Sequence, residues 1–408
     1  MTEDRIAARE AAQRTLQAWE ERLVALSREI HADPELAFDE HRAAARVAGV
    51  LRAAGLRTTA GAYGLPTAVE AVAGDGEFTV TLCAEYDALP GIGHACGHNI
   101  IAAAGVGAAV ALAPLVDALG IRLKLLGTPA EEHGGGKAVM LASGAWEDST
   151  VSLMVHGAPG ADISCADIRS QAVDRFDVTF TGRAAHAAGE PELGVNAGNA
   201  ATIALVAIGL LRQHLPEGIR LNAFVAEAGE ATNVIAASAL VRVEVRSPDL
   251  DLLRDGKRRV LACFEGGAVA TGCGWSWRDA EPLYANVVQD PDLAAAWDRN
   301  VAATGRTVTR RPGARAGSTD MGNVSQVVPA IHPMIGVLGV TGMPHTEQFR
   351  LDAATPAADR AALDGAAALA GTVIDIVTDP ALRAAFLARQ RSREPGATTR
   401  PLVDVRRP

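Results

Sequence analysis

The sequence TVTLCAEYDALP at residues 79–90, followed by HACGHN at residues 94–99, decides how this chain folds. The first stretch is apolar until it reaches an acidic, proline-containing turn, which predicts a buried strand that ends in a loop. In that loop Cys96 and His98 lie two residues apart among small residues, so a turning backbone could aim a thiolate and an imidazole at one ion. Sulfur beside nitrogen suits Zn²⁺ or another late divalent metal far better than Mg²⁺ or Ca²⁺.

Strands and helices alternate on both sides of this stretch. The apolar patterns predict strands near residues 67–73, 121–127 and 150–156, and helices near residues 99–118 and 135–144. This order predicts an α/β fold with a mostly parallel central sheet flanked by helices. Ligands of such a sheet lie at the carboxyl ends of its strands.

The pattern changes after about residue 168 to the order β-α-β-β-α-β, which is typical of a ferredoxin-like α+β domain. We therefore predict one domain in two parts, residues 1–168 and 282–389, with a second domain inserted at residues 169–281. Residues 390–408 are rich in Arg, Pro and Thr and are predicted to form a disordered tail.

Composition excludes several classes of protein. The 408 residues carry a formal net charge of −10, which argues against nucleic acid as a main partner. The five scattered cysteines favour free or metal-bound thiols over a disulfide framework. The first thirty residues lack the apolar core of a signal peptide, and residues 100–119 are better interpreted as a buried helix than as a membrane span. We expect a cytoplasmic protein with no membrane partner.

Further metal-binding side chains occur where predicted strands end, at Glu131, Glu132, His156 and His345. Adjacent carboxylates leaving a strand cannot both point the same way, so one can bind metal while its neighbour accepts a proton from water. Taken singly, the glutamates fit an acidic surface turn and the histidines fit hydrogen-bonded core residues. Their convergence on one predicted sheet indicates instead a site for two metals that share a water.

The motifs AEYDALP at residues 84–90, CGHN at residues 96–99 and PAEE at residues 129–132 resemble the aminoacylase/carboxypeptidase superfamily of dimetal amidohydrolases, a group of metallopeptidases. More narrowly, they resemble the branch of auxin-conjugate hydrolases, aminobenzoyl-glutamate hydrolase and β-alanyl-dipeptide hydrolases. The resemblance implies hydrolysis of the amide bond of an N-acyl amino acid or unusual dipeptide with a free carboxylate. It also implies two divalent ions, Zn²⁺ or Mn²⁺ with Co²⁺ or Ni²⁺ as alternatives, and a homodimer or larger oligomer in which the inserted domain is a lid and dimerisation domain.

The resemblance implies five metal ligands: Cys96, His98, Glu132, His156 and His345. It makes Glu131 the general base and Asp87 a residue that orients the ligands. Glu85 stands where other members of the superfamily place a ligand histidine, which agrees with the cysteine-containing branch. His94 is expected to support the site, and His133 is expected to be a loop residue.

The inserted domain supplies a second set of candidates. GRAAHA at residues 182–187 is similar to a lid motif whose histidine, here His186, stabilises the oxyanion, often across a dimer interface. Asn233 matches a substrate-binding asparagine, although Ala236 stands where the family usually has proline. Arg246 could grip a substrate carboxylate with two parallel hydrogen bonds, or be a solvated charge at the end of a strand.

Other functions remain open. A metal-dependent aromatic deaminase on the same scaffold would release ammonia instead of an amino acid. A non-catalytic metal-binding protein would be marked by loss of Glu131 or of a ligand, and the sequence retains them all. A metal-free α/β protein would contain no metal when purified.

Overall fold

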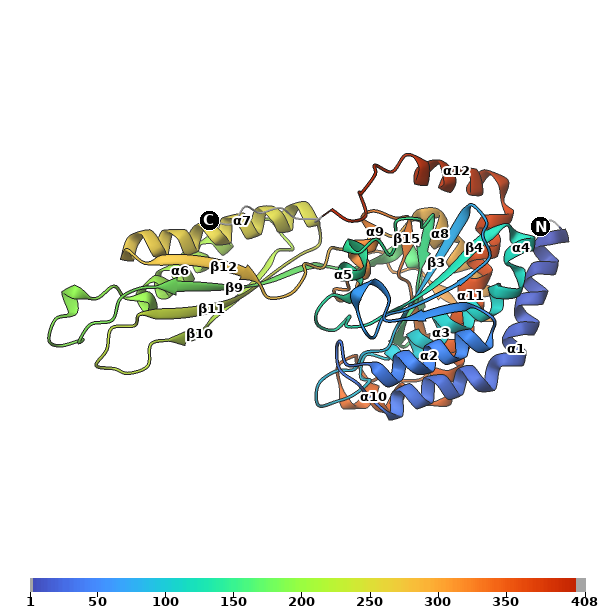
Figure 1. Cartoon of the computed structure of the whole chain (residues 1–408), viewed down its shortest axis with the longest axis horizontal. Coiled ribbons are helices and arrows are strands. Elements are labelled where there is room, and N and C mark those ends of the chain that lie inside the picture. Colours follow the sequence, from blue (N-terminus) through green and yellow to red (C-terminus); the bar gives the residue numbers. More distant parts are fainter. Residues whose placement is uncertain (1–2, 401–408) are drawn as a thin grey trace. The chain divides into compact units, whose positions relative to one another are not determined.

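The computed structural model describes residues 3–400, which divide into two units (Figure 1). The first unit comprises residues 3–169, 287–316 and 320–400. The second comprises residues 170–286 and 317–319. The division falls after Arg169 and before Val287, close to the predicted boundaries, and residues 401–408 of the predicted tail lie outside the described residues.

The first unit is built on a six-stranded sheet with the order β1-β2-β4-β3-β5-β15. The strands β4, β3, β5 and β15 are parallel to one another, and only β2 runs antiparallel to its neighbours. The prediction of a mostly parallel sheet is therefore confirmed. Its strands are β1 (Arg57–Ala60), β2 (Val69–Ala73), β3 (Phe78–Glu85), β4 (Ile121–Thr128), β5 (Val151–Leu153) and β15 (Ala330–Ile331).

Helices cover both faces of this sheet because its strands are apolar on both sides. In β3, Val80 and Leu82 join the main core, whereas Cys83 joins a smaller core on the other face. The main core includes residues of α1 (Glu3–Ala32), α2 (His41–Ala53), α3 (His98–Leu112), α8 (Pro291–Ala303), α11 (Pro356–Thr378) and α12 (Pro380–Arg391). The smaller core includes residues of α5 (Gly136–Ala142) and α9 (Met321–Ser325).

Two predicted elements are shorter than expected. The predicted helix at residues 99–118 is interrupted after Leu112, where Pro114 lies in a 3-10 turn before α4 (Val116–Leu119), because proline cannot donate the helical hydrogen bond. The predicted strand at residues 150–156 is divided into β5 and β6 (His156–Pro159). The chain changes partners there: β5 pairs with β3, and β6 pairs with β16 (Met334–Val337). His156 therefore begins a strand instead of ending one.

The predicted tail is partly ordered. α12 continues to Arg391, and residues 392–400 belong to the first unit. Gln390 donates a hydrogen bond to the Asp148 carbonyl at 2.7 Å, and Arg393 donates one to the Ser149 carbonyl at 2.9 Å. The prediction of disorder is therefore wrong for residues 390–400. The side chains of Gln390 and Arg393 hydrogen-bond backbone carbonyl groups of the first unit.

The second unit is a four-stranded antiparallel sheet, β10-β11-β9-β12, with two helices. Its elements are β9 (Ala172–Thr181), α6 (Ala197–Leu211), β10 (Arg220–Ala228), β11 (Ser238–Ser247), α7 (Leu250–Thr271) and β12 (Gly274–Asp279). The order along the chain is the β-α-β-β-α-β pattern that the sequence predicted. Buried residues of both helices and of the sheet form one separate core.

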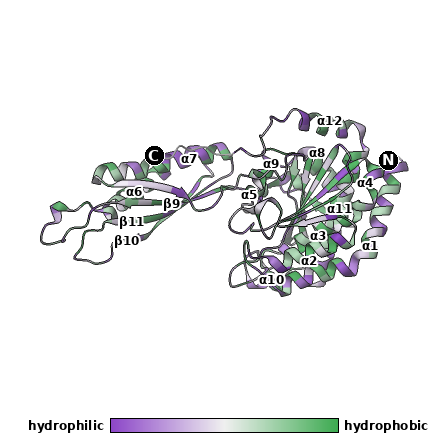
Figure 2. Ribbon diagram, in the orientation of Figure 1, coloured by the Kyte–Doolittle hydropathy of each residue, from purple (hydrophilic) through white to green (hydrophobic). Residues whose placement is uncertain are grey.

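Two helical stretches, His98–Leu119 and Pro356–Thr378, are long and apolar enough to cross a membrane by length and composition. Most of each stretch is buried inside the structure, as is usual for core helices. Figure 2 shows the largely hydrophobic colouring of α3 and α11, the main helices of these stretches, within the first unit.

Candidate functional site

Asp87, just beyond β3, orients two parts of the candidate site. One of its carboxylate oxygens lies 3.0 Å from His98 Nδ1, and the other accepts the backbone N–H of Glu132 at 2.9 Å. A carboxylate at Nδ1 holds the proton there, so Nε2 is the nitrogen at which a metal would replace a proton. Burial alone would raise the pKa of Asp87, but the charge and hydrogen bond of His98 outweigh it and lower the pKa to about 2.

The turn before α3 places Cys96 beside a second histidine. Gly97 has a φ of 82°, a backbone conformation that favours glycine, and this turn lets Cys96 and His98 face the same site. Cys96 Sγ lies 3.5 Å from His156 Nε2. His156 Nδ1 hydrogen-bonds the Gly157 carbonyl at 2.7 Å, so Nδ1 is the donor and Nε2 is available as a ligand atom. Burial lowers the pKa of His156 to about 3, which keeps its ring neutral.

The two glutamates follow β4 in a strained loop. Ala130 has a φ of 60°, and its N–H is held by the buried carboxylate of Glu40 at 2.8 Å. Gly136 closes the loop so tightly that a Cβ there would lie 1.8 Å from the Pro129 carbonyl oxygen. Left-handed backbone at a non-glycine residue is costly and is concentrated at functional sites. Here it directs Glu131 and Glu132 into the site.

His345 completes the set from a distant part of the chain. Its N–H donates to the Ala95 carbonyl at 2.8 Å, which ties its loop to the turn that carries Cys96. Its Nε2 lies 3.5 Å from Glu132 Oε2. Its φ of 65° is also left-handed. Thr346 caps the following helix, α10 (Glu347–Asp352), so the position of His345 is fixed at a helix start.

The structure therefore brings all five predicted ligands into one site. Ligand atoms of three groups lie within 4.8 Å of one another: Cys96, His98 and His156; Cys96, Glu132 and His345; and Glu85, His98 and Glu131. Within the described chain, His98 Nε2, Glu132 Oε1 and Glu85 Oε2 are buried without hydrogen-bond partners. Buried polar atoms are rarely left unpaired, so this set of sulfur, nitrogen and oxygen donors fits divalent cations.

Glu131 lies inside this group of donors. Its Oε2 is 3.7 Å from His98 Nε2. Burial, followed by the charges of Glu85 and Glu132, raises the pKa of Glu131 well above its ordinary value. A buried carboxyl with a raised pKa beside potential ligands is suited to receive a proton and pass it on.

The second unit brings His186 and Asn233 together. The Ala187 N–H donates to the Asn233 carbonyl at 2.9 Å, and His186 pairs with Val234. His186 Nδ1 accepts the N–H groups of Ala188 and Gly189 at 3.2 and 2.9 Å. A neutral ring held in this way carries its proton on Nε2, and the side chain is exposed. His186 is thus fixed as a hydrogen-bond donor.

Arg246 is already paired in this structure. Its Nε lies 2.7 Å from Glu244 Oε1, and Glu244 is shared with Arg175 at 2.8 Å. Nη1 of Arg246 also reaches Ser318 at 3.4 Å, which helps explain why residues 317–319 group with the second unit. A substrate carboxylate would therefore compete with Glu244 for Arg246.

Comparison with known proteins shows to which protein family the chain belongs. A model described as peptidase family M20/M25/M40 matches residues 79–370. The chain belongs to this family. An Xaa-Arg dipeptidase of Mus musculus is 36% identical over 92% of this chain and 90% of its own length. An Escherichia coli protein that forms part of p-aminobenzoyl-glutamate hydrolase is 30% identical over 63% of this chain and 57% of its own length. The predicted membership of the amidohydrolase and metallopeptidase group is confirmed.

A solved M20 structure supports the fold. A dinuclear metal binding peptidase of the M20 family from Bacillus subtilis has a TM-score of 0.68 and covers 89% of this chain and 99% of its own. Its sequence identity is 20%, so the likeness concerns the fold alone.

Three buried residues of this M20 chain were not singled out as a group by the sequence. The Lys137 ammonium pairs with Glu85 and, at 2.8 Å, with Asp320. All three side chains are fully buried. Burial alone would lower the pKa of Lys137, but Asp320 and Glu85 outweigh it and raise the pKa above its ordinary value. The sequence marked Glu85 by its place in the AEYDALP motif, and Lys137 directly follows three glycines, but neither feature pairs the two residues.

His94 and His133, which were not predicted to be ligands, lie outside the three groups of potential ligands found among residues 3–400. His94 is buried with its ring centre 6.2 Å from that of His31. His133 is exposed in the turn after Glu132.

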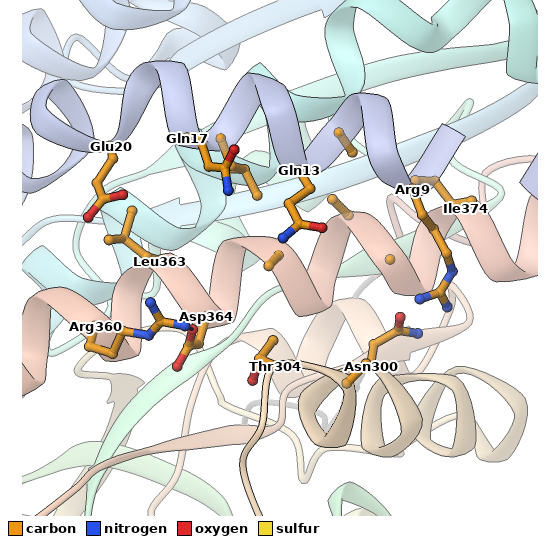
Figure 3. A pocket seen from close by; sticks show the side chains of 16 residues that line it. Arg9, Gln13, Gln17, Glu20, Asn300, Thr304, Arg360, Leu363, Asp364 and Ile374 are labelled. Carbon is orange, nitrogen blue, oxygen red and sulfur yellow. Dashed lines mark ion pairs between the residues drawn. The ribbon is translucent and has the colours of Figure 1, made fainter. Parts of the chain in front are cut away.

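A cavity of about 340 Å³ lies between α1, α8 and α11 (Figure 3). Its arginines already have partners: Arg360 lies 2.7 Å from Asp364, and Arg9 pairs with Asp375. The cavity lining includes none of the candidate site residues.

Proposed function

We propose that the chain hydrolyses the amide bond of a small N-acyl amino acid or dipeptide with a free carboxylate, using two divalent metal ions. The M20 relatives are named as a dipeptidase and a hydrolase, which supports this reaction class. The observation that carries the proposal is the group of unpaired buried donors around His98 Nε2, with Glu131 beside them. The proposed metal ligands are Cys96, His98, Glu132, His156 and His345.

Two divalent cations held by these residues would activate a water molecule and polarise the amide carbonyl. Glu131 would accept the proton of the attacking water and deliver it to the departing amine. Asp87 would keep the Nδ1 proton on His98 and hold the backbone of Glu132 in place. The hydrogen bond from Ala130 to Glu40 would keep the Glu131 loop in its strained conformation.

The second unit is proposed to act as the lid. His186 would donate its Nε2 proton to the developing oxyanion, since Nδ1 is committed to backbone N–H groups. Asn233 and Arg246 would bind the substrate, with Arg246 exchanging Glu244 for the substrate carboxylate. Closure of such a lid would exclude bulk water from the reacting groups.

A hydrolysis screen tests the reaction. The chain, reconstituted separately with Zn²⁺, Mn²⁺, Co²⁺ and Ni²⁺, is offered dipeptides ending in arginine, p-aminobenzoyl-glutamate, indole-acyl amino acids and β-alanyl dipeptides. Release of a free amino acid supports the proposal. Release of ammonia alone would favour the deaminase, and bound metal without turnover across the screen would favour a non-catalytic binding protein.

The second unit is also the proposed dimerisation surface. In α6, Ile203, Val206 and Leu210 are exposed, the last two at 60% and 71%. The neighbouring strand β10 is an edge of its sheet and exposes Phe224 at 51%. An open strand edge beside exposed apolar side chains favours association with a second copy. The five cysteines are all free, which fits the proposed cytoplasmic location.

A further inference from the structure

The buried ion cluster of Glu85, Lys137 and Asp320 lies directly behind the candidate metal site. Glu85 ends β3, Lys137 is in the first turn of α5, and Asp320 precedes α9. The Lys137 ammonium contacts both carboxylates, and its backbone N–H donates to Asp320 Oδ2 at 2.7 Å. The cluster therefore ties three elements together at the carboxyl end of the sheet.

Lys137 occupies only one oxygen of Glu85. The ammonium contacts Oε1, whereas Oε2 is buried and has no hydrogen-bond partner among the described residues. Oε2 lies 3.7 Å from His98 Nε2, the nitrogen at which a metal would replace a proton. Glu132 Oε1 lies 3.8 Å from the same nitrogen and is also unpaired within residues 3–400.

Glu85 Oε2 and His98 Nε2 are thus two buried ligand-type atoms that face each other without a hydrogen bond. Their separation of 3.7 Å is too long for a hydrogen bond, yet it leaves room for a cation at about 2.0–2.2 Å from each atom. Glu131 Oε2 lies at the same distance of 3.7 Å from His98 Nε2. The charges agree with this, because the two carboxylates of the cluster outnumber its one ammonium, and a buried carboxylate is stabilised by a neighbouring cation.

We propose that Glu85 is a sixth metal ligand, which binds through Oε2 the cation held by His98. Lys137 and Asp320 are positioning residues that hold the other Glu85 oxygen and fix the rotation of the carboxylate. This assignment rests on the proposed two-metal function and extends its set of ligands. It also gives the fully buried Lys137 a role, since a ligand carboxylate is itself usually held by a further hydrogen bond.

Metal affinity of two Glu85 variants tests the proposal. Glu85→Gln keeps the side-chain size and an oxygen acceptor for Lys137, but it replaces the anionic oxygen that faces His98. Glu85→Asp keeps the charge and withdraws it by one methylene, and it serves if the glutamine variant fails to fold. Each protein is loaded with Zn²⁺ or Co²⁺, challenged with graded chelator and analysed for metal per chain.

We expect both variants to hold one of the two ions at least about 10-fold more weakly than the unchanged chain and to alter the visible spectrum of bound Co²⁺. Asp148→Asn is the matched control. Like Glu85, Asp148 pairs with a buried lysine of the first unit, here Lys124. Asp148 precedes β5, whereas the proposed ligand His156 lies beyond the other end of that strand. That variant should retain metal normally. Unchanged metal affinity and spectrum in either folded Glu85 variant would overturn the proposal, even if turnover fell. Failure of the unchanged chain to bind two ions would instead overturn the proposed function.

Discussion

At the scale of single residues, Glu131 and Glu132 show how adjacent identical side chains acquire different roles. Glu132 faces His345, with Oε2 3.5 Å from Nε2, and its backbone is held by Asp87. Glu131 is 6% exposed, and its carboxylate lies within 4.8 Å of ligand atoms of Glu85 and His98. Successive residues leaving a strand point in different directions, so only one of them needs to be a ligand.

The change Glu131→Gln separates catalysis from metal binding. Loss of the proton acceptor should lower kcat by at least about 100-fold, while the five proposed ligands still hold two ions. Turnover of an amide substrate and metal content by elemental analysis are measured on the same preparation. Near-normal turnover would remove Glu131 as the base, and loss of both metals would make it a ligand.

At the scale of elements, the sequence predicted the strands and helices that the periodic pattern of apolar residues determines. The strands β3 and β4 and the whole second unit follow from runs of apolar residues and their order. The five proposed ligands could be named because their side chains are of metal-binding types and lie in motifs that resemble those of a known family. The contact of Glu40 with Ala130 spans 90 residues, and that of Lys137 with Asp320 spans 183. Such contacts depend on how the elements pack in the folded chain, so the sequence around each residue does not predict them.

Glu40, which precedes α2, supports the loop after β4 and makes stability depend on pH. Burial, followed by the charge of Asp87, raises its pKa from 4.5 to about 7. The folded chain therefore binds a proton that the unfolded chain releases between these values, so stability should fall as pH rises from about 4.5 to about 7. The loss due to Glu40 should reach at most roughly 3 kcal/mol.

The matched variant is Glu40→Gln, which keeps an acceptor for the Ala130 N–H and cannot ionise. Urea unfolding of both metal-free proteins at pH 5 and pH 8 gives the difference in their free energies of unfolding. Relative to the variant, the unchanged chain should lose stability at the higher pH. Equal pH dependence of the two proteins would show that Glu40 does not titrate in this range.

At the scale of the whole molecule, the proposed catalytic groups are divided between two units that each have their own core. The first unit holds the candidate ligands and Glu131, and the second holds His186, Asn233 and Arg246. Under the proposed function, a complete site would need groups from both units, supplied either by one chain or by two copies. The exposed apolar face of α6 beside the open edge of β10 favours association of two copies.

Mixing two inactive variants decides between these arrangements. Glu131→Gln chains retain His186, and His186→Ala chains retain Glu131. If His186 acts across a dimer, a mixed dimer contains one complete site, so an equal mixture that exchanges subunits freely should recover about one quarter of wild-type activity. We expect this recovery. It should disappear when both chains also carry Val206→Asp and Leu210→Asp, because two charges on the α6 face would prevent association. Val269→Asp, at a residue of α7 that is 78% exposed, is the control that should leave the recovery intact. An inactive mixture in which the two variants, carrying different affinity tags, co-purify as mixed dimers would place His186 and Glu131 of one chain in the same site.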